Sequence, residues 1–250
     1  MYVLRWGNVH IATVSRMIDI GNTEFLIDVR SLAKDDFEAY SSRLFDTWDE
    51  YIEKSLKVPD YSISLEIEEG SIKGKGRIAV LAGALYLGIG NYGDFISGLK
   101  TIRGQVSYLG NKLVQSAVSP FEENNVKTTY RNNGGALTHL NRLFQKVQKG
   151  ELTADQAMIE AQRILGDDVN SSPEFIQKLN EALENAPKYP KQVSLFEEAE
   201  NELDDSNDEK NKKKPSRTPT PKPDIPANQF RVEIWRESKR SKKNVKISKL

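Results

Sequence analysis

Residues 78–90 read IAVLAGALYLGIG, thirteen consecutive positions without a charged or strongly polar side chain. From residue 78 to residue 99 the only charge is Asp94, so an apolar span of residues 78–99 has about the length that a bilayer core requires. An uninterrupted run of thirteen residues is also typical of a buried core helix or an interfacial segment. This stretch therefore leaves two interpretations open, a membrane segment and a core helix.

We interpret residues 78–99 as the start of a glycine-rich apolar helix that continues toward Pro120, with a break near residues 90–93. In the membrane interpretation this transmembrane helix candidate inserts in a bilayer or lies on it. The apolar side chains that would then contact lipid are Ile78, Val80, Leu81, Leu85, Leu87 and Ile89.

The residues before this run predict a small antiparallel sheet and one long helix. Strand patterns cover residues 2–6, 24–29, 61–68 and 72–77, and turns are expected at residues 21–22 and 69–70. Between the second and third strands, Ser31 has the character of an N-cap, and an amphipathic helix follows over residues 32–56, closed by Pro59. We therefore expect residues 1–120 to form one α+β domain that includes the apolar helix.

Residues 133–190 predict a small helical bundle. Three apolar stripes of helical period are separated by Gly150 and Gly166, which are typical helix stops. Thr153 is placed to cap the second helix, and Pro173 is placed at the first position of the third. We expect three short helices joined by compact turns.

The net charge of zero conceals an asymmetry along the chain. Residues 210–250 contain 14 Lys and Arg against 3 Asp and Glu, a surplus of +11 that the rest of the chain balances with −11. Residues 197–209 hold eight acids and no base, and the next residues are rich in lysine and proline. This composition predicts a disordered linker over residues 197–228, acidic first and then basic.

Residues 229–250 combine one strand pattern, over residues 230–235, with a basic tail. A lone strand is not stable by itself, so it must dock back on the amino-terminal sheet or add to the sheet edge of a partner. The tail residues expected to contact phosphates or lipid headgroups are Arg236, Lys239, Arg240, Lys242, Lys243 and Lys246. Trp235 is the only aromatic side chain near them after residue 230, so a stacking platform for bases is lacking.

Motifs for catalysis, metals and cofactors are weak. Gly88, Gly90 and Gly93 match a dinucleotide-binding spacing, but no acid follows at the distance that a ribose contact needs. His10 and His139 have no metal-ligand spacing beside them, and we interpret Glu66, Glu68 and Glu69 as a solvated strand edge. The chain has no cysteine, which excludes disulfides and thiol nucleophiles. We expect no catalytic residue, cofactor, metal or small-molecule ligand, although an enzyme is not excluded.

Two functional hypotheses follow. The first is a non-enzymatic, membrane-associated or interaction protein, in which residues 78–99 insert in or lie on a bilayer while the basic tail contacts anionic lipid. The second is a soluble adaptor whose apolar helix is core and whose basic tail binds nucleic acid or an acidic protein partner. The acidic body could also meet a partner or a second copy of the chain. Both hypotheses place the protein in the cytoplasm, the first of them at a membrane.

Overall fold

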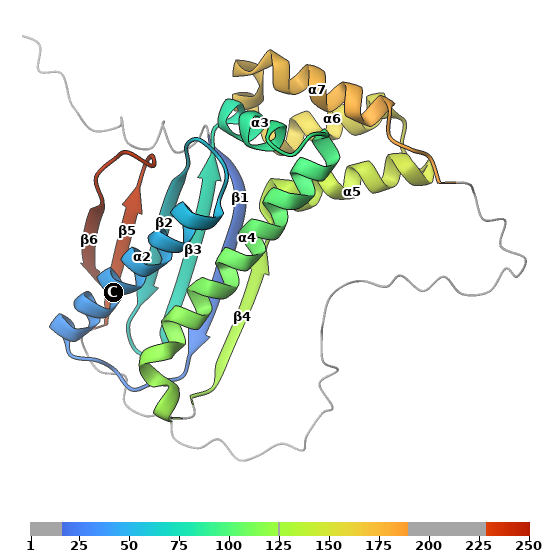
Figure 1. Ribbon diagram of the computed structural model, residues 1–250. Helices are drawn as coiled ribbons and strands as arrows, with labels where there is room; N and C mark the ends of the chain where they lie inside the picture. Colours follow the sequence, from blue (N-terminus) through green and yellow to red (C-terminus); the bar gives the residue numbers. More distant parts are fainter. Residues whose placement is uncertain (1–16, 125, 190–228) are drawn as a thin grey trace, which may run out of the picture.

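The fold is α+β, as the sequence predicts, and it is built on one antiparallel sheet (Figure 1). A computed structural model describes residues 17–124, 126–189 and 229–250. The strand predicted over residues 2–6 and the linker predicted over residues 197–228 lie outside these described residues. Two long helices cover one face of the sheet, and the shorter helices pack together at one end (Figure 1).

The sheet has six strands in the order β4-β1-β3-β2-β5-β6, and every neighbouring pair is antiparallel. The strands are β1 (Ile18–Ile27), β2 (Ser62–Glu68), β3 (Ile72–Val80), β4 (Thr128–Asn133), β5 (Phe230–Arg236) and β6 (Asn244–Lys249). The hairpin of β2 and β3 confirms the prediction from the alternating pattern. The strand beyond the linker docks back on the amino-terminal sheet, because β5 pairs with β2.

The sequence patterns predict neither of the two edge strands, β4 and β6. The sequence of β4 is TTYRNN, which has no apolar alternation, and the sequence of β6 is NVKISK, which we interpreted as part of a basic tail. Each acquires its strand conformation from one neighbour, β1 for β4 and β5 for β6. Pairing with an existing strand thus determines these two segments more than their own pattern does.

The covering helices are α2 (Lys34–Ser55) and α4 (Phe95–Val118), which lie side by side over the central strands (Figure 1). They meet over Gly76 of β3, where a Cβ atom would lie 2.3 Å from Leu113 of α4 and 3.0 Å from Trp48 of α2. The Trp48 indole is 1% exposed, and its Nε1 donates a hydrogen bond to the carbonyl oxygen of Leu109 at 3.1 Å. The absence of a side chain at residue 76 thus lets both helices approach the sheet closely.

The apolar run does not form one helix. Its first three residues, 78–80, complete β3, and α3 (Ala82–Gly90) follows as a separate short helix. The chain then leaves helical geometry until α4 begins after Asp94, whose carboxylate accepts a hydrogen bond from the backbone N–H of Ser97 at 2.9 Å. The expected break near residues 90–93 is confirmed, whereas the expected helix start at residue 78 is wrong. The reason is tertiary, since Ile78 pairs on both sides, with Gly21 of β1 and Ile63 of β2.

The three-helix prediction for the second half is confirmed. Thr153 forms a capping box with Gln156, and Gly150 ends the preceding helix in the left-handed conformation at φ 74°. The first helix packs against β1 and α4, and the third contacts α3. The helices are α5 (Gly135–Lys149), α6 (Ala154–Leu165) and α7 (Pro173–Glu184), and short 3-10 turns occupy η1 (Ser119–Asn124) and η2 (Asp167–Ser171).

Three local predictions near the amino terminus need correction. Gly21 does not form a turn but lies inside β1 at a register shift, where a Cβ would come within 2.2 Å of Val106 on α4. Ser31 does not cap α2, because Ala33 occupies the N-cap position. Instead, the Ser31 hydroxyl donates a hydrogen bond to Glu69, which is 7% exposed and therefore not a solvated edge residue. In each case, contact with a distant segment outweighs the local preference.

Candidate functional site

One end of the sheet brings together segments that are far apart in the sequence. Ile78 of β3 and Arg236 of β5 both pair with Ile63 of β2, so the two residues lie at the same level along the strands. Beyond this level β3 leads into Leu81 and α3, and β5 leads into the turn of residues 237–243. Only β2 separates the two strands, a distance of about 10 Å. Helix α3 and the turn therefore emerge at the same end of the molecule (Figure 1).

The loop of residues 56–61, between α2 and β2, connects these two features. On one side it contacts α3, where a Cβ at Gly88 would lie 2.6 Å from Val58 Cγ1 and 3.3 Å from the carbonyl oxygen of Lys57. On the other side the carboxylate of Asp60 accepts a hydrogen bond from the backbone N–H of Lys239 at 2.7 Å. Helix α3, the loop and the turn thus form one continuous surface, which we call the sheet-end surface.

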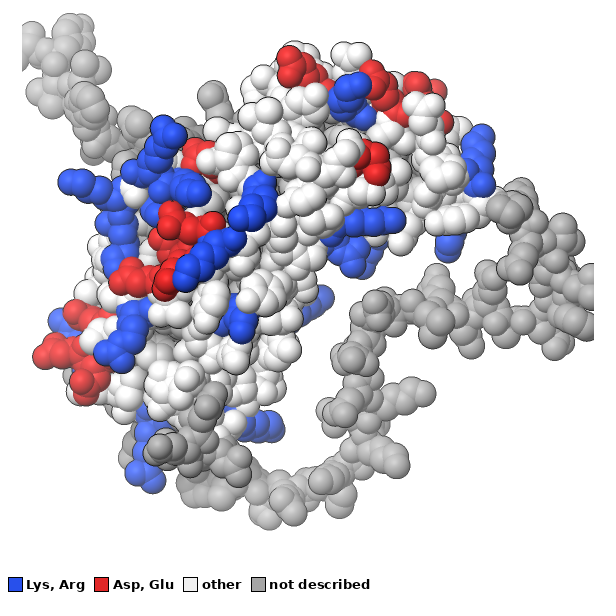
Figure 2. Space-filling model, viewed as in Figure 1, with Lys and Arg blue, Asp and Glu red and all other residues white. Residues whose placement is uncertain are grey.

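The apolar part of this surface is smaller than the sequence suggests. Four of the six side chains expected to contact lipid are core residues at 0–2% exposure, namely Ile78, Val80, Leu85 and Ile89. Leu81 and Leu87 are 41% and 60% exposed. No charged residue occurs between residues 78 and 93, and the surface over α3 is almost entirely uncharged in Figure 2. The exposed leucines at this end are therefore Leu81, which directly precedes α3, and Leu87, which lies on it.

The basic part of the surface is the turn between β5 and β6, where blue side chains gather in Figure 2. Three of the six residues expected to contact phosphate or lipid are used inside the fold. Arg236 pairs with Asp49 of α2, Lys243 with Asp46 of α2 at 2.6 Å, and Lys246 with Glu233 of β5 at 3.3 Å. Within the described residues the other three cations form no side-chain hydrogen bond or ion pair: Lys239, Arg240 and Lys242.

Arg236 and Asp49 anchor the hairpin of β5 and β6 to α2. Their side chains are 11% and 19% exposed, and Arg236 also donates a hydrogen bond to the hydroxyl of Tyr61 at 3.2 Å. Burial raises the pKa of Asp49 above its ordinary value, and the charge of Arg236 opposes this rise. Burial likewise raises the pKa of Tyr61. The ionised Asp49 is therefore tolerated at neutral pH because its cation is present.

We expect Arg236→Ala to lower the free energy of unfolding by roughly 2–3 kcal/mol at pH 7, because it leaves a half-buried carboxylate without its cation. The raised pKa of Asp49 gives this cost a pH dependence. Below the ordinary aspartate pKa the carboxyl is neutral in both states, and the penalty appears as pH rises through the folded-state pKa of Asp49. Urea unfolding of the variant and of the original protein at pH 7 and pH 4 measures the difference.

The matched control is Arg240→Ala, which removes a cation without a side-chain partner in the same turn, as far as the structure describes the chain. Its free energy of unfolding is expected to stay within about 0.5 kcal/mol of the original value at both pH values. Equal losses from the two substitutions would contradict an anchoring role for Arg236.

Comparison of the chain with protein-family models, with curated proteins and with solved structures finds no match. No group of three or more His, Asp or Glu side chains in the described part of the chain is arranged to hold a metal ion. Within the same residues, no helix combines the length and the apolar character that crossing a bilayer needs.

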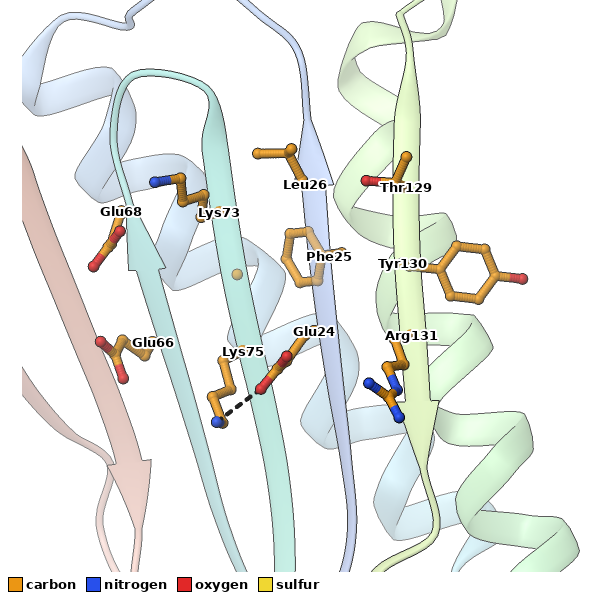
Figure 3. Close-up of a pocket in the computed structure, with 11 residues that line it drawn as sticks. Glu24, Phe25, Leu26, Glu66, Glu68, Lys73, Lys75, Thr129, Tyr130 and Arg131 are labelled. Carbon is orange, nitrogen blue, oxygen red and sulfur yellow. Dashed lines mark ion pairs between the residues drawn. The ribbon is translucent and has the colours of Figure 1, made fainter. Parts of the chain in front are cut away.

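The sheet face opposite α2 and α4 forms a second candidate surface, with a concavity of about 540 Å³ (Figure 3). Its central pair is Lys75 and Glu24, 2.8 Å apart, and this pairing lowers the pKa of Glu24. Lys73 and Arg131 form no ion pair with any described residue, and Figure 3 shows them well apart from each other. Positive and negative side chains thus alternate on this face, and Lys73 and Arg131 do not point toward a common position. The face therefore does not indicate which kind of ligand it would bind.

The contacts that unite the sheet-end surface were not found from the sequence. The turn of residues 237–243 is more than 100 residues from the loop and from α3, and neither Val58 nor Asp60 carries a motif. The signals that were present are the uncharged run of α3 and the density of lysine and arginine after residue 235. Their proximity is a result of strand pairing.

Proposed function

We propose that this protein is a non-enzymatic peripheral membrane protein that lies on an anionic bilayer through the sheet-end surface. The observation that carries the proposal is the presence, at one end of the sheet, of two exposed leucines and of three cations that form no ion pair with a described residue. The sequence alone counts against such a proposal, because the basic tail is more than 130 residues away from the apolar run. In the fold that separation is bridged by the loop of residues 56–61.

The binding free energy expected from these leucines and cations favours weak and reversible binding. Complete transfer of a leucine side chain out of water contributes roughly 1.5–3 kcal/mol, and about half of that is available from Leu81 and from Leu87, which are partly exposed. Each cation near an anionic leaflet contributes about 1 kcal/mol. The sum is on the order of 5 kcal/mol, which corresponds to a dissociation constant below 1 mM. Binding of this kind is salt-sensitive and does not require a membrane-spanning helix.

Sedimentation with lipid vesicles tests the proposal. We expect the full chain to sediment with vesicles of phosphatidylcholine and phosphatidylserine in 0.1 M salt, to be released by raised salt, and to stay unbound with phosphatidylcholine alone. A Leu81→Ser/Leu87→Ser variant should lose about thirtyfold in affinity. A Lys239→Ala/Arg240→Ala/Lys242→Ala variant should lose on the order of a hundredfold.

Matched controls lie elsewhere on the molecule. Ile159→Ser removes an apolar side chain of α6 that is 67% exposed. Lys73→Ala/Arg131→Ala removes from the open sheet face two cations that form no ion pair with a described residue. Both variants should bind vesicles as the original chain does. The proposal fails if the two sheet-end variants bind like the controls. It also fails if the cation variant loses binding to DNA or RNA while no form of the protein binds vesicles.

A further inference from the structure

The outer edge of β6 lacks a strand partner among the described residues. Among the strands that the structure describes, β6 is the last in the sheet order and pairs with β5 alone. Its pairing is regular to the end of the chain, where the backbone N–H of Leu250 donates to the carbonyl oxygen of Gln229 at 2.8 Å. A well-formed edge strand presents a row of free N–H and C=O groups that can receive a further strand.

The side chains of β6 continue the apolar face of its neighbour. In the register of the hairpin, Ile247 lies opposite Val232 and Val245 lies opposite Ile234. The two residues of β5 are each 1% exposed, because α2 packs on that strand. Val245 and Ile247 are 47% and 41% exposed. The apolar face of the sheet thus continues onto β6, one strand beyond the strand that α2 covers.

The other edge of the sheet differs in this respect. β4 has the sequence TTYRNN, with no aliphatic side chain on either face. Natural proteins commonly protect edge strands with charged or polar residues. β4 follows this rule throughout, whereas β6 has Lys246 and Lys249 but also exposes two β-branched apolar side chains beside its free backbone groups.

The charge of the hairpin indicates what kind of strand fits. Residues 229–250 carry eight lysines and arginines against two glutamates. A second copy of β6 placed alongside would bring two strongly basic hairpins together, which is electrostatically unfavourable. An acidic strand meets the opposite charge.

We propose that β6 docks an extended acidic segment of a partner protein as a seventh strand of the sheet. Alternate apolar side chains of that segment continue the row of Val245 and Ile247, and its acidic side chains lie on the other face, on the side of Lys246. The backbone bonds provide the pairing, and the side chains select the partner. This interaction uses β6 and is independent of the membrane contact proposed for α3 and the turn.

The test uses a labelled, end-capped octapeptide of alternating glutamate and valine, with binding to the full chain measured by fluorescence anisotropy. A second peptide of the same sequence is N-methylated at alternate residues, which removes the backbone donors on one edge and leaves the charge unchanged. We expect the first peptide to bind, and the N-methylated peptide to bind at least tenfold more weakly. Hydrogen exchange should slow at the backbone amides of β6 when the first peptide is added.

Substitutions locate the site. Val245→Thr/Ile247→Thr keeps β-branched side chains but removes apolar surface, and we expect it to weaken binding of the first peptide about tenfold. Tyr130→Thr, the matched change on the exposed edge strand β4, should leave binding unchanged. Equal binding of the two peptides would show attraction by charge alone and overturn the proposal. So would unchanged binding in the Val245→Thr/Ile247→Thr variant, or a dimer of the chain that this variant dissociates.

Discussion

Leu85→Lys is expected to unfold the protein, whereas Leu87→Lys is expected to leave its stability nearly unchanged. The two leucines are two residues apart in α3, but Leu85 is 0% exposed and Leu87 is 60% exposed. A lysine at residue 85 would place an ammonium group in a core without a partner, which costs at least about 4 kcal/mol. A lysine at residue 87 would extend into solvent and should change the free energy of unfolding by less than about 0.5 kcal/mol.

Urea unfolding, followed by circular dichroism and tryptophan fluorescence, measures both variants. We expect the Leu85→Lys chain to lack a cooperative transition, or to unfold at a much lower urea concentration with the same slope. Leu87→Lys should superimpose on the original protein. Similar transitions for the two variants would mean that α3 does not pack with the side chains that the structure shows, and the sheet-end surface would lose its basis.

Trp48→Ala is expected to lower the free energy of unfolding by about 3–5 kcal/mol, because it removes the largest fully buried side chain of the core. Trp48 fills the space where α2, α4 and β3 meet. The substitution would leave a cavity there, and Gly76 beside it has no side chain to fill it. The substitution also removes the hydrogen bond from the indole to the carbonyl of Leu109. The same urea titration measures the loss.

Two further variants separate the contributions at this position. Trp48→Phe keeps an aromatic ring but lacks the indole N–H, so an intermediate loss of about 1–3 kcal/mol is expected. Tyr108→Ala, at a 45% exposed position of α4, should cost less than about 1 kcal/mol. If Trp48→Ala were no more destabilising than Tyr108→Ala, the helix pair would not be anchored on the sheet as described.

The basic end of the chain illustrates how structure changes the interpretation of a charge cluster. As a sequence, residues 236–249 are a run of cations available to any polyanion. In the fold, Arg231 pairs with Glu66 and Glu68 on β2, and Arg236 pairs with Asp49 on α2. Part of the charge therefore holds the hairpin on the acidic body of the protein. Lys239, Arg240 and Lys242 of the turn form no ion pair with a described residue, so they are the ones left for a partner.

Local patterns predicted the elements in which apolar spacing and capping residues lie within the same segment. The alternation in residues 61–68 predicted β2, and the apolar stripes with Thr153, Gly150 and Pro173 predicted the helices of the second half. The apolar and aromatic spacing of residues 32–56 predicted α2, apart from its start. These elements bury a face of their own period, so a single sequence is sufficient to recognise them.

Other features depended on contacts that no local pattern encodes. Residues 78–80 are as apolar as α3, but they lie between β1 and β2 and therefore complete a strand. The strands β4 and β6 form because β1 and β5 offer them an edge. In the candidate site, the sequence identified the uncharged run and the lysines, but not which leucines are exposed or which cations are unpaired.

By itself, the sequence of this protein determined an α+β fold, a helical second half and an asymmetric distribution of charge, because periodicity and composition act over a few residues at a time. Only the tertiary structure decided that the apolar run is mostly core, that the basic end is a hairpin, and that α3 and the turn of residues 237–243 share one surface. The first outcome depends on the pairing of β3 with β1 and β2. The other two depend on pairing between strands more than 150 residues apart, β2 with β5, whose register places Arg236 at the level of Ile78. Register is set by the joint burial of both strands, so it becomes defined only when the sheet is assembled.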